Sequence, residues 1–323
     1  MAISDRKTDI CNLILNSKFP FRKTLNLDKK IQFGVEIEFE NADYYSVKRD
    51  LENRKKLNKW TIDDDATVKY IDGFSKYGGE LISPILHDNV VSWNQIKSAC
   101  HLIKRNYGLI RGRSAAHIHI DSSILNDDIN SILNFVKIWT AYEHVIYRFS
   151  YGEDKKEREM LIEYAAPVAN YFYDVIRNIE EYGFTGNVKN FYKYFFYSTL
   201  TDNMAAGISF MNCAGFPDEK NTIEVRCPNG TLNAKVWQNN INFFIKLLLY
   251  SASSYYDKDL IDKKIKDYKY KYLIDYSDIY FGDAEELMNL IFDSDDDKLY
   301  FLNQYLKINM SNKDNIIEKV KMK

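Results

Sequence analysis

The sequence predicts an α+β fold built on a mainly antiparallel sheet. Three observations support this prediction: strand-like segments occur singly or in pairs, helical segments of unequal length separate them, and glycine (13) and proline (5) are scarce among the 323 residues. Scarce glycine and proline favour long regular elements. The irregular order of strands and helices favours an antiparallel sheet with helices on one face over a barrel of eight alternating units.

The first 121 residues alternate helical segments with strands. We expect a helix over 5–16 and a basic connector to residue 30, and then a strand over 32–40, where Phe33, Val35, Ile37 and Phe39 alternate with Glu36, Glu38 and Glu40. A charged helical segment follows at 46–58, and an amphipathic helix is expected over 89–106. Between them we expect a strand or turn around the acidic run 63–65, and a short strand over 78–83 that Pro84 ends. A further strand is predicted over 116–121.

The rest of the chain is mostly helical. Helical patterns at 125–149, 155–181 and 188–200 form a mid-chain block, strands return at 207–213 and 221–227, and a long helix follows over 232–256. The final region is polar, rich in tyrosine and helical in character.

Composition limits the function classes. Lys+Arg (44) and Asp+Glu (46) nearly balance, with a formal net charge of −2. This balance argues against a protein that coats nucleic acid or an anionic membrane, so we expect neither as a partner. The four cysteines form no CxxC pair, and we find no signal-peptide pattern and no apolar run of membrane-spanning length. The expected location is the cytoplasm.

Four predicted strands carry charged or imidazole side chains in alternation with apolar residues: Glu36 and Glu38, Glu80, His117 and His119, and Glu224 and Arg226. Each pattern alone has an ordinary explanation, such as a solvated acidic edge, a satisfied histidine pair or a surface ion pair of little energetic value. If the strands share one sheet, however, this polar face requires bound cations. Carboxylate oxygens with one imidazole suit Mg²⁺ or Mn²⁺ better than Zn²⁺. Several divalent ions beside an arginine indicate a polyphosphate such as ATP.

The order of these motifs resembles the putative amidoligase family, a branch of the carboxylate–amine ligases that share the glutamine synthetase and glutamate–cysteine ligase catalytic fold. The motifs are Gly34-x-Glu36-x-Glu38, Asp65-Ala66-Thr67-Val68, Gly79-Glu80-Leu81-x-Ser83-Pro84, His117-x-His119-x-Asp121 and Thr222-Ile223-Glu224-x-Arg226, and the likeness spans about residues 32–250. The resemblance implies ATP-dependent formation of an amide or peptide-like bond through an acyl phosphate. It also implies that the concave polar face of the sheet binds ATP and two or three Mg²⁺ (or Mn²⁺) ions.

The resemblance also implies roles for individual residues. The implied metal ligands are Glu36, Glu38, Glu80, His117 and Glu224, with Glu80 on the side of the amine substrate. His119 would reach the nucleotide phosphates, and Arg226 would steady the transferred phosphoryl group. Asp65 matches a catalytic position, for which Asp64 is an alternative. Two departures are Ala115-Ala116 before the first histidine, where the family usually has small residues such as Cys-Gly, and the lack of a matching arginine ahead of Asn212.

Several alternatives remain open at this point. The substrate would be an amino acid, peptide or protein that supplies a carboxylate, together with an amine donor. Asp65, Glu153 and Asp154 are candidates to take the proton of the amine, and Arg111 and Arg113 are candidates to hold an acceptor carboxylate. A metal-dependent hydrolase that uses the His-x-His and glutamate cluster is a second interpretation, and a non-catalytic relative that acts as a binding module is a third.

The expected organisation follows from the extent of the resemblance. Residues 1–30 would form an N-terminal helix and connector. Residues 31–256 would form the amidoligase-like catalytic domain, with a helical block at about 125–200. Residues 257–323 would form a helical region packed on that domain. The sequence makes no prediction of the oligomeric state.

Overall fold

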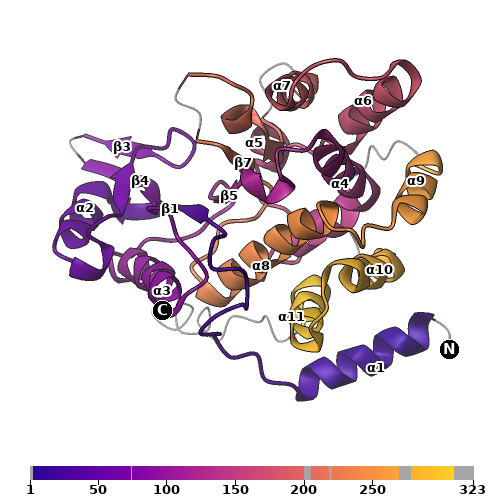
Figure 1. Ribbon diagram of the computed structural model, residues 1–323. Coiled ribbons are helices and arrows are strands. Elements are labelled where there is room, and N and C mark those ends of the chain that lie inside the picture. Colours follow the sequence, from indigo (N-terminus) through magenta and orange to yellow (C-terminus); the bar gives the residue numbers. More distant parts are fainter. Residues whose placement is uncertain (1–2, 74, 200–204, 218–219, 269–277, 309–323) are drawn as a thin grey trace.

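The computed structural model describes residues 3–73, 75–199, 205–217, 220–268 and 278–308. At its centre lies a seven-stranded sheet (Figure 1). The strands are β1 (Phe33–Asp43), β2 (Thr61–Asp63), β3 (Tyr70–Asp72), β4 (Ser75–Ile82), β5 (Ala116–Asp121), β6 (Ile208–Ser209) and β7 (Thr222–Val225). Their order is β2-β4-β1-β5-β7-β6, with β3 also paired to β4, and every pair is antiparallel. The predicted antiparallel sheet is therefore confirmed.

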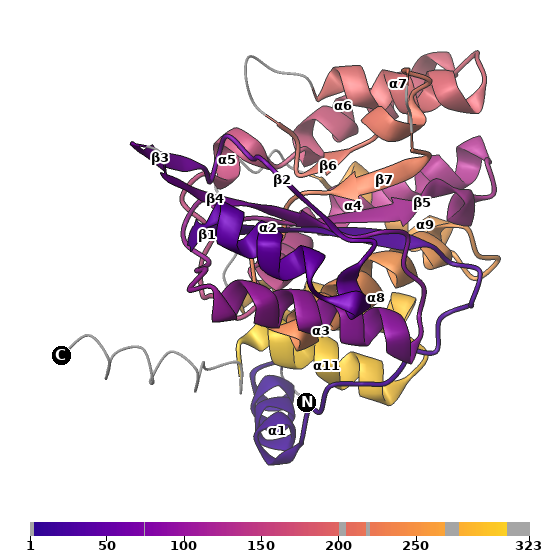
Figure 2. The same ribbon diagram turned by 90° about the vertical axis from the view of Figure 1, so that its left-hand side faces the viewer.

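The two faces of the sheet differ as the alternation in β1 requires. Phe33, Val35, Ile37 and Phe39 are all buried, and Phe33 stacks on Trp93 of α3 (Val90–Arg105) with 5.3 Å between ring centroids. Figure 2 shows the sheet nearly edge-on, with α3 and α8 (Ala234–Ser251) on one side and α6 (Ala169–Tyr182) and α7 (Val188–Ser198) on the other. Helices α3 and α8 cover the apolar face, so the alternate side chains of β1 project away from them.

The remaining helices complete the fold, and several of them pack on α4. They are α1 (Ile3–Asn16), α2 (Tyr44–Glu52), α4 (Ile129–Ser150), α5 (Leu161–Tyr164), α6 (Ala169–Tyr182), α7 (Val188–Ser198), α9 (Lys258–Lys266), α10 (Phe281–Ile291) and α11 (Asp295–Leu306). Helix α4 is mostly buried and contacts α6, α8, α9, α10 and α11. One cluster of buried apolar side chains runs from Ile14 to Tyr305. Among the described residues, no helix has the length and apolar character needed to cross a bilayer.

One predicted helix is wrong. The segment 155–181 contains α5 and α6, with residues 155–160 outside any helix. Pro167 lies between the two helices, lacks an N–H and disfavours helical geometry at the residue before it. Arg158 also holds the start of the segment in place, because its guanidinium donates to the carbonyl oxygens of residues 226–228.

Two other predicted elements are shorter than expected. The strand predicted over 207–213 is only the two-residue β6, because the chain turns into a 3-10 helix at Met211–Cys213, where Met211 N donates to Ser209 Oγ. The helix predicted over 46–58 is α2 followed by a 3-10 turn at Lys55–Leu57. It begins earlier because the Asp43 side chain accepts a hydrogen bond from Ser46 N.

Candidate functional site

The register of the sheet places the predicted site residues opposite one another. Glu38 of β1 faces Glu80 of β4, and Glu36 faces His117 of β5. On the next strand, His119 faces Glu224 of β7. The expectation that the four polar strands share one sheet is therefore confirmed.

Direct contacts link the members of this face. Glu36 Oε2 lies 3.2 Å from His117 Nδ1, and Glu36 Oε1 lies 3.0 Å from His119 Nε2. His117 Nε2 lies 3.4 Å from Glu38 Oε1. Arg226 Nη1 donates to Glu224 Oε1 at 2.5 Å, and that oxygen lies 3.8 Å from His117 Nδ1. Glu36 is therefore the central acid, with an imidazole on each of its two oxygens.

Three overlapping groups of side chains could hold a metal ion. They are Glu36, Glu80 and His117; Glu36, His119 and Glu224; and Glu38, Asp65 and Glu80, and within each group the possible ligand atoms lie within 4.8 Å of one another. Every implied metal ligand belongs to at least one group. His119, expected to reach phosphates, is also a possible metal ligand beside Glu36 and Glu224.

The geometry distinguishes Asp65 from Asp64. Asp64 forms ion pairs with Lys69 and Lys76, which direct its carboxylate toward those cations. Asp65 belongs to the group with Glu38 and Glu80, and its carboxylate accepts from Thr67 N at 2.6 Å. Of the two acids, Asp65 is thus the one at the polar face.

The protonation of the acids follows their surroundings. Burial opposes ionisation of Glu36, but hydrogen bonds with His117 and His119 outweigh burial and hold the pKa of Glu36 far below its usual range. Glu80 differs: burial, together with the negative charges of Glu36 and Asp65, raises its pKa to about 8. Burial also raises the pKa of Glu38. A bound cation would offset both the burial and the mutual repulsion that raise the pKa values of Glu38 and Glu80.

The donor set fits a hard divalent ion. Each group supplies carboxylate oxygens and at most one imidazole, the ligand chemistry that Mg²⁺ and Mn²⁺ prefer. Arg226 is 23% exposed at this face, and the neighbouring carboxylate of Glu224 raises its pKa despite burial. The arrangement therefore offers ligands suited to divalent ions, with a positively charged guanidinium beside them.

Backbone and neighbouring side chains position the acids. Ala115 N donates to Glu38 Oε2 at 2.6 Å, and Thr222 Oγ1 lies 3.2 Å from His119 Nδ1. Because the donor to Glu38 is a backbone N–H, alanine at residues 115 and 116 is compatible with this contact.

Sequence reasoning missed Arg158, which is 4% exposed and bonds the backbone just after β7. It lies in a charged segment with Lys155 and Lys156, where no sequence signal separates a buried arginine from a solvated cation.

Other candidates lie outside the donor groups. Glu153 accepts from Thr231 Oγ1 at 3.3 Å, and Asp154 accepts from Asn229 Nδ2 at 3.2 Å. Neither belongs to any of the metal-binding groups found among the described residues. Asp65 remains the candidate proton acceptor at the polar face.

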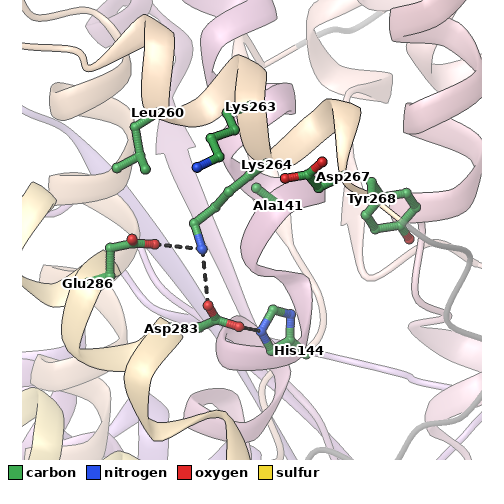
Figure 3. A pocket seen from close by; sticks show the side chains of 9 residues that line it. All are labelled: Ala141, His144, Leu260, Lys263, Lys264, Asp267, Tyr268, Asp283 and Glu286. Carbon is green, nitrogen blue, oxygen red and sulfur yellow. Dashed lines mark hydrogen bonds and ion pairs between the residues drawn. The ribbon is translucent and has the colours of Figure 1, made fainter.

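A separate cavity of about 400 Å³ lies between α4, α9 and α10 (Figure 3). Its polar side chains pair with one another: Lys264 Nζ lies 3.0 Å from Asp283 Oδ1 and 2.6 Å from Glu286 Oε1, and Asp283 Oδ2 lies 2.7 Å from His144 Nε2. These ion pairs connect the three helices.

Comparison with known proteins gives one family. A family model described as "Putative amidoligase enzyme" matches residues 29–248, more than half of the chain. The match contains every strand of the sheet and all of the residues grouped above. A search of curated proteins found no match.

Proposed function

Because the chain belongs to the putative amidoligase family, we propose that it is an ATP-dependent ligase that joins a carboxylate to an amine. The acid and the amine would come from an amino acid, a peptide or a protein. The product would be an amide or peptide-like bond, formed through an acyl phosphate with Mg²⁺ or Mn²⁺ as the metal.

One observation carries this proposal. Three overlapping carboxylate and imidazole groups lie on one face of the sheet, with the guanidinium of Arg226 at their edge. A row of acids of this kind, bounded by a cation, suits a triphosphate held by several divalent ions. Glu36 belongs to two of the three groups, which makes it the residue on which neighbouring ions would depend most.

The chemistry assigns a task to each part of this face. The substrate carboxylate attacks the terminal phosphorus of ATP, giving an acyl phosphate and ADP. The amine then attacks the acyl carbon, phosphate leaves, and the amine loses a proton. Bound divalent ions would offset the repulsion between the two anions in the first step. Arg226 would donate to oxygens of the transferred phosphoryl group, and Asp65 would accept the proton.

The donor chemistry favours this function over metal-dependent hydrolysis. A zinc hydrolase would be expected to collect its imidazoles around one ion. Here His117 and His119 fall in different groups, each dominated by carboxylates. A non-catalytic relative is also less favoured, because half-buried acids that repel one another, such as Glu80, are costly to keep without a cation.

Metal-dependent nucleotide binding tests the proposal. Titration calorimetry with a non-hydrolysable ATP analogue should show binding that requires Mg²⁺. Glu36→Gln and Glu224→Gln should each weaken it by at least about 10-fold, since loss of even an outer partner of a metal ligand has effects of that size. Asp72→Asn removes an exposed carboxylate of the same sheet and should leave it unchanged. Equal affinity with and without Mg²⁺ would refute the proposal.

Turnover measurements distinguish two possible roles of Arg226: a contact with the transferred phosphoryl group and a structural ion pair with Glu224. ADP release should be screened against panels of carboxylates and amines. With an active pair, Arg226→Lys should lower kcat by at least about 10-fold with a smaller change in the KM for ATP, because a point charge cannot bridge two phosphoryl oxygens. If Arg226→Lys turns over normally while Arg226→Ala only melts earlier, the arginine serves the ion pair with Glu224 and not phosphoryl transfer.

A further inference from the structure

A second arginine stands at the Glu38 end of the polar face. Glu40 follows Glu38 by two residues on β1 and is buried. Its carboxylate accepts from Ser114 Oγ at 3.1 Å and lies 3.4 Å from Arg113 Nη2. Because Ala115 binds Glu38 directly, the turn that carries Arg113 is attached to the same strand as the metal-binding acids.

Close packing holds this turn in place. Ser114 N donates to Arg111 O at 3.1 Å and closes the turn. A Cβ at Gly112 would lie 2.4 Å from the side chain of Glu159, and a Cβ at Gly230 would lie 2.8 Å from Ser114 O. Gly230 thus allows a close backbone contact with Ser114, where Gly230 N donates to Ser114 O at 3.0 Å, and the side chain of Glu159 packs on Gly112. A preformed position reduces the ordering that a ligand would otherwise have to impose.

The guanidinium of Arg113 keeps most of its donors available. Its side chain is 45% exposed, whereas that of Glu40 is 8% exposed. Glu40 is its hydrogen-bonding partner among the described residues, and this contact uses one of the five N–H groups. Glu40 therefore orients one edge of the guanidinium and leaves the other edge free.

Arg113 and the candidate metal ligands are joined through β1. Glu40, which contacts Arg113, follows Glu38 by two residues, and Ala115, two residues after Arg113, donates to Glu38. Glu38 in turn belongs to the group with Asp65 and Glu80. Because alternate residues on one strand are roughly 7 Å apart, Arg113 lies at the end of the polar face next to that group. Arg111, on the same turn, is exposed and has no such link to β1 among the described residues.

We propose that Arg113 binds a substrate carboxylate that does not react. This inference rests on the proposed ligase function and narrows the substrate class: one of the two substrates carries a carboxylate in addition to the group that is joined. The planar guanidinium edge matches two carboxylate oxygens, as a lysine could not. Glu40 is a positioning residue that acts through Arg113.

Matched probes test the inference directly. In the presence of Mg²⁺ and the ATP analogue, calorimetry should compare straight-chain dicarboxylates from succinate to adipate with monocarboxylates of equal length. A second set should compare ω-amino acids with the corresponding alkylamines, which asks whether the bound carboxylate belongs to the acid or to the amine substrate. The wild-type protein should prefer the probe with the extra carboxylate by about 10-fold or more in one set, since charged hydrogen bonds are worth that much.

Variants of the same turn make the result specific. Arg113→Ala should abolish the preference, Arg113→Lys should restore part of it, and Arg111→Ala, which removes the same charge two residues away, should keep it. The inference is overturned if neither set shows a preference, if the preference survives in Arg113→Ala, or if Arg111→Ala loses it equally. Magnesium-dependent binding of the ATP analogue is measured in the same samples. If the wild-type protein shows no magnesium-dependent binding of the analogue, the result counts against the ligase proposal. If it binds the analogue but shows no preference that depends on Arg113, the result counts against this inference alone.

Discussion

Carboxylates on the same polar face differ in their pKa values. Glu36 has an imidazole on each oxygen and ionises readily, whereas Glu80 has neighbouring acids and a pKa of about 8. Burial and repulsion from the neighbouring carboxylates therefore both favour the protonated form of Glu80. A cation would remove that repulsion and compete with the proton for the same oxygen.

Metal binding should therefore release the proton of Glu80. Below pH 8 the metal-free protein carries this proton, so Mg²⁺ affinity should rise as pH increases from about 6 to 8. Calorimetry in buffers with different ionisation enthalpies should detect a released proton, and Glu80→Gln should abolish that release.

The same group makes stability depend on pH. Because the pKa of Glu80 rises from 4.5 in the unfolded chain to about 8, the stability that this group contributes is complete below pH 4.5 and is lost as pH rises through 8. Metal affinity and stability that are unaffected by pH over this range would contradict the assignment.

At the scale of elements, two glycines allow β4 to approach the turn that carries Asp65. Gly78 has φ +79°, and a Cβ there would lie 2.4 Å from Val68 O. Val68 belongs to the turn that the Lys69 N to Asp65 O hydrogen bond closes. Gly79 is similarly close, since its Cβ would lie 2.9 Å from Asp63 O. The acid-bearing turn thus depends on the absence of side chains in β4.

Two glycine substitutions separate backbone strain from packing. Gly73 also has a positive φ, +57°, but a Cβ there would meet nothing within 4 Å. Gly73→Ala should lower the free energy of unfolding by about 1 kcal/mol through backbone strain alone. Gly78→Ala should lower the free energy of unfolding by about 1–3 kcal/mol more, because the added methyl group overpacks the contact with Val68. It should also weaken Mg²⁺ binding, because the Asp65 turn must shift. Chemical denaturation and metal titration measure both effects. Equal losses in the two variants would show that the contact with Val68 is unimportant.

The elements also show what a sequence can and cannot predict. The strict alternation in β1 identified its buried and polar faces, because period two is a local property. The early end of β6 was not predicted. The hydrophobic pattern does not reveal the hydrogen bond from Met211 N to Ser209 Oγ that accompanies the turn after this strand. The choice between Asp64 and Asp65 depends on Lys76 of β4, a contact between separate strands. Arg158 was missed for the same reason, since its partners lie about 70 residues away.

On the scale of the whole molecule, contacts connect the C-terminal helices to the polar face. Lys307, just after α11, donates to Arg148 O and Gly152 O, both at 2.8 Å. The segment after Gly152 leads to Arg158, whose guanidinium bonds the carbonyl oxygens of Arg226 and Pro228 at 3.1 and 2.9 Å. The family match ends at residue 248, yet the apolar core continues to Tyr305. We therefore expect the described C-terminal residues, 257–268 and 278–308, to unfold together with the sheet.

Replacing Lys307 tests whether the molecule unfolds as one unit. Lys307→Met keeps the aliphatic length but leaves two carbonyl oxygens without their donor, so the free energy of unfolding should fall by about 1–3 kcal/mol. Lys258→Met is the matched control, because Lys258 is 73% exposed and pairs with Asp262 on the surface of α9, where the loss should be within about 0.5 kcal/mol. Denaturation should be followed by circular dichroism and by the fluorescence of the buried Trp93, Trp139 and Trp237. In a single cooperative unit, Lys307→Met moves both transitions together. If the fluorescence transition stays in place while only the dichroism shifts, the C-terminal helices unfold separately, and the contacts through Lys307 do not couple them to the polar face.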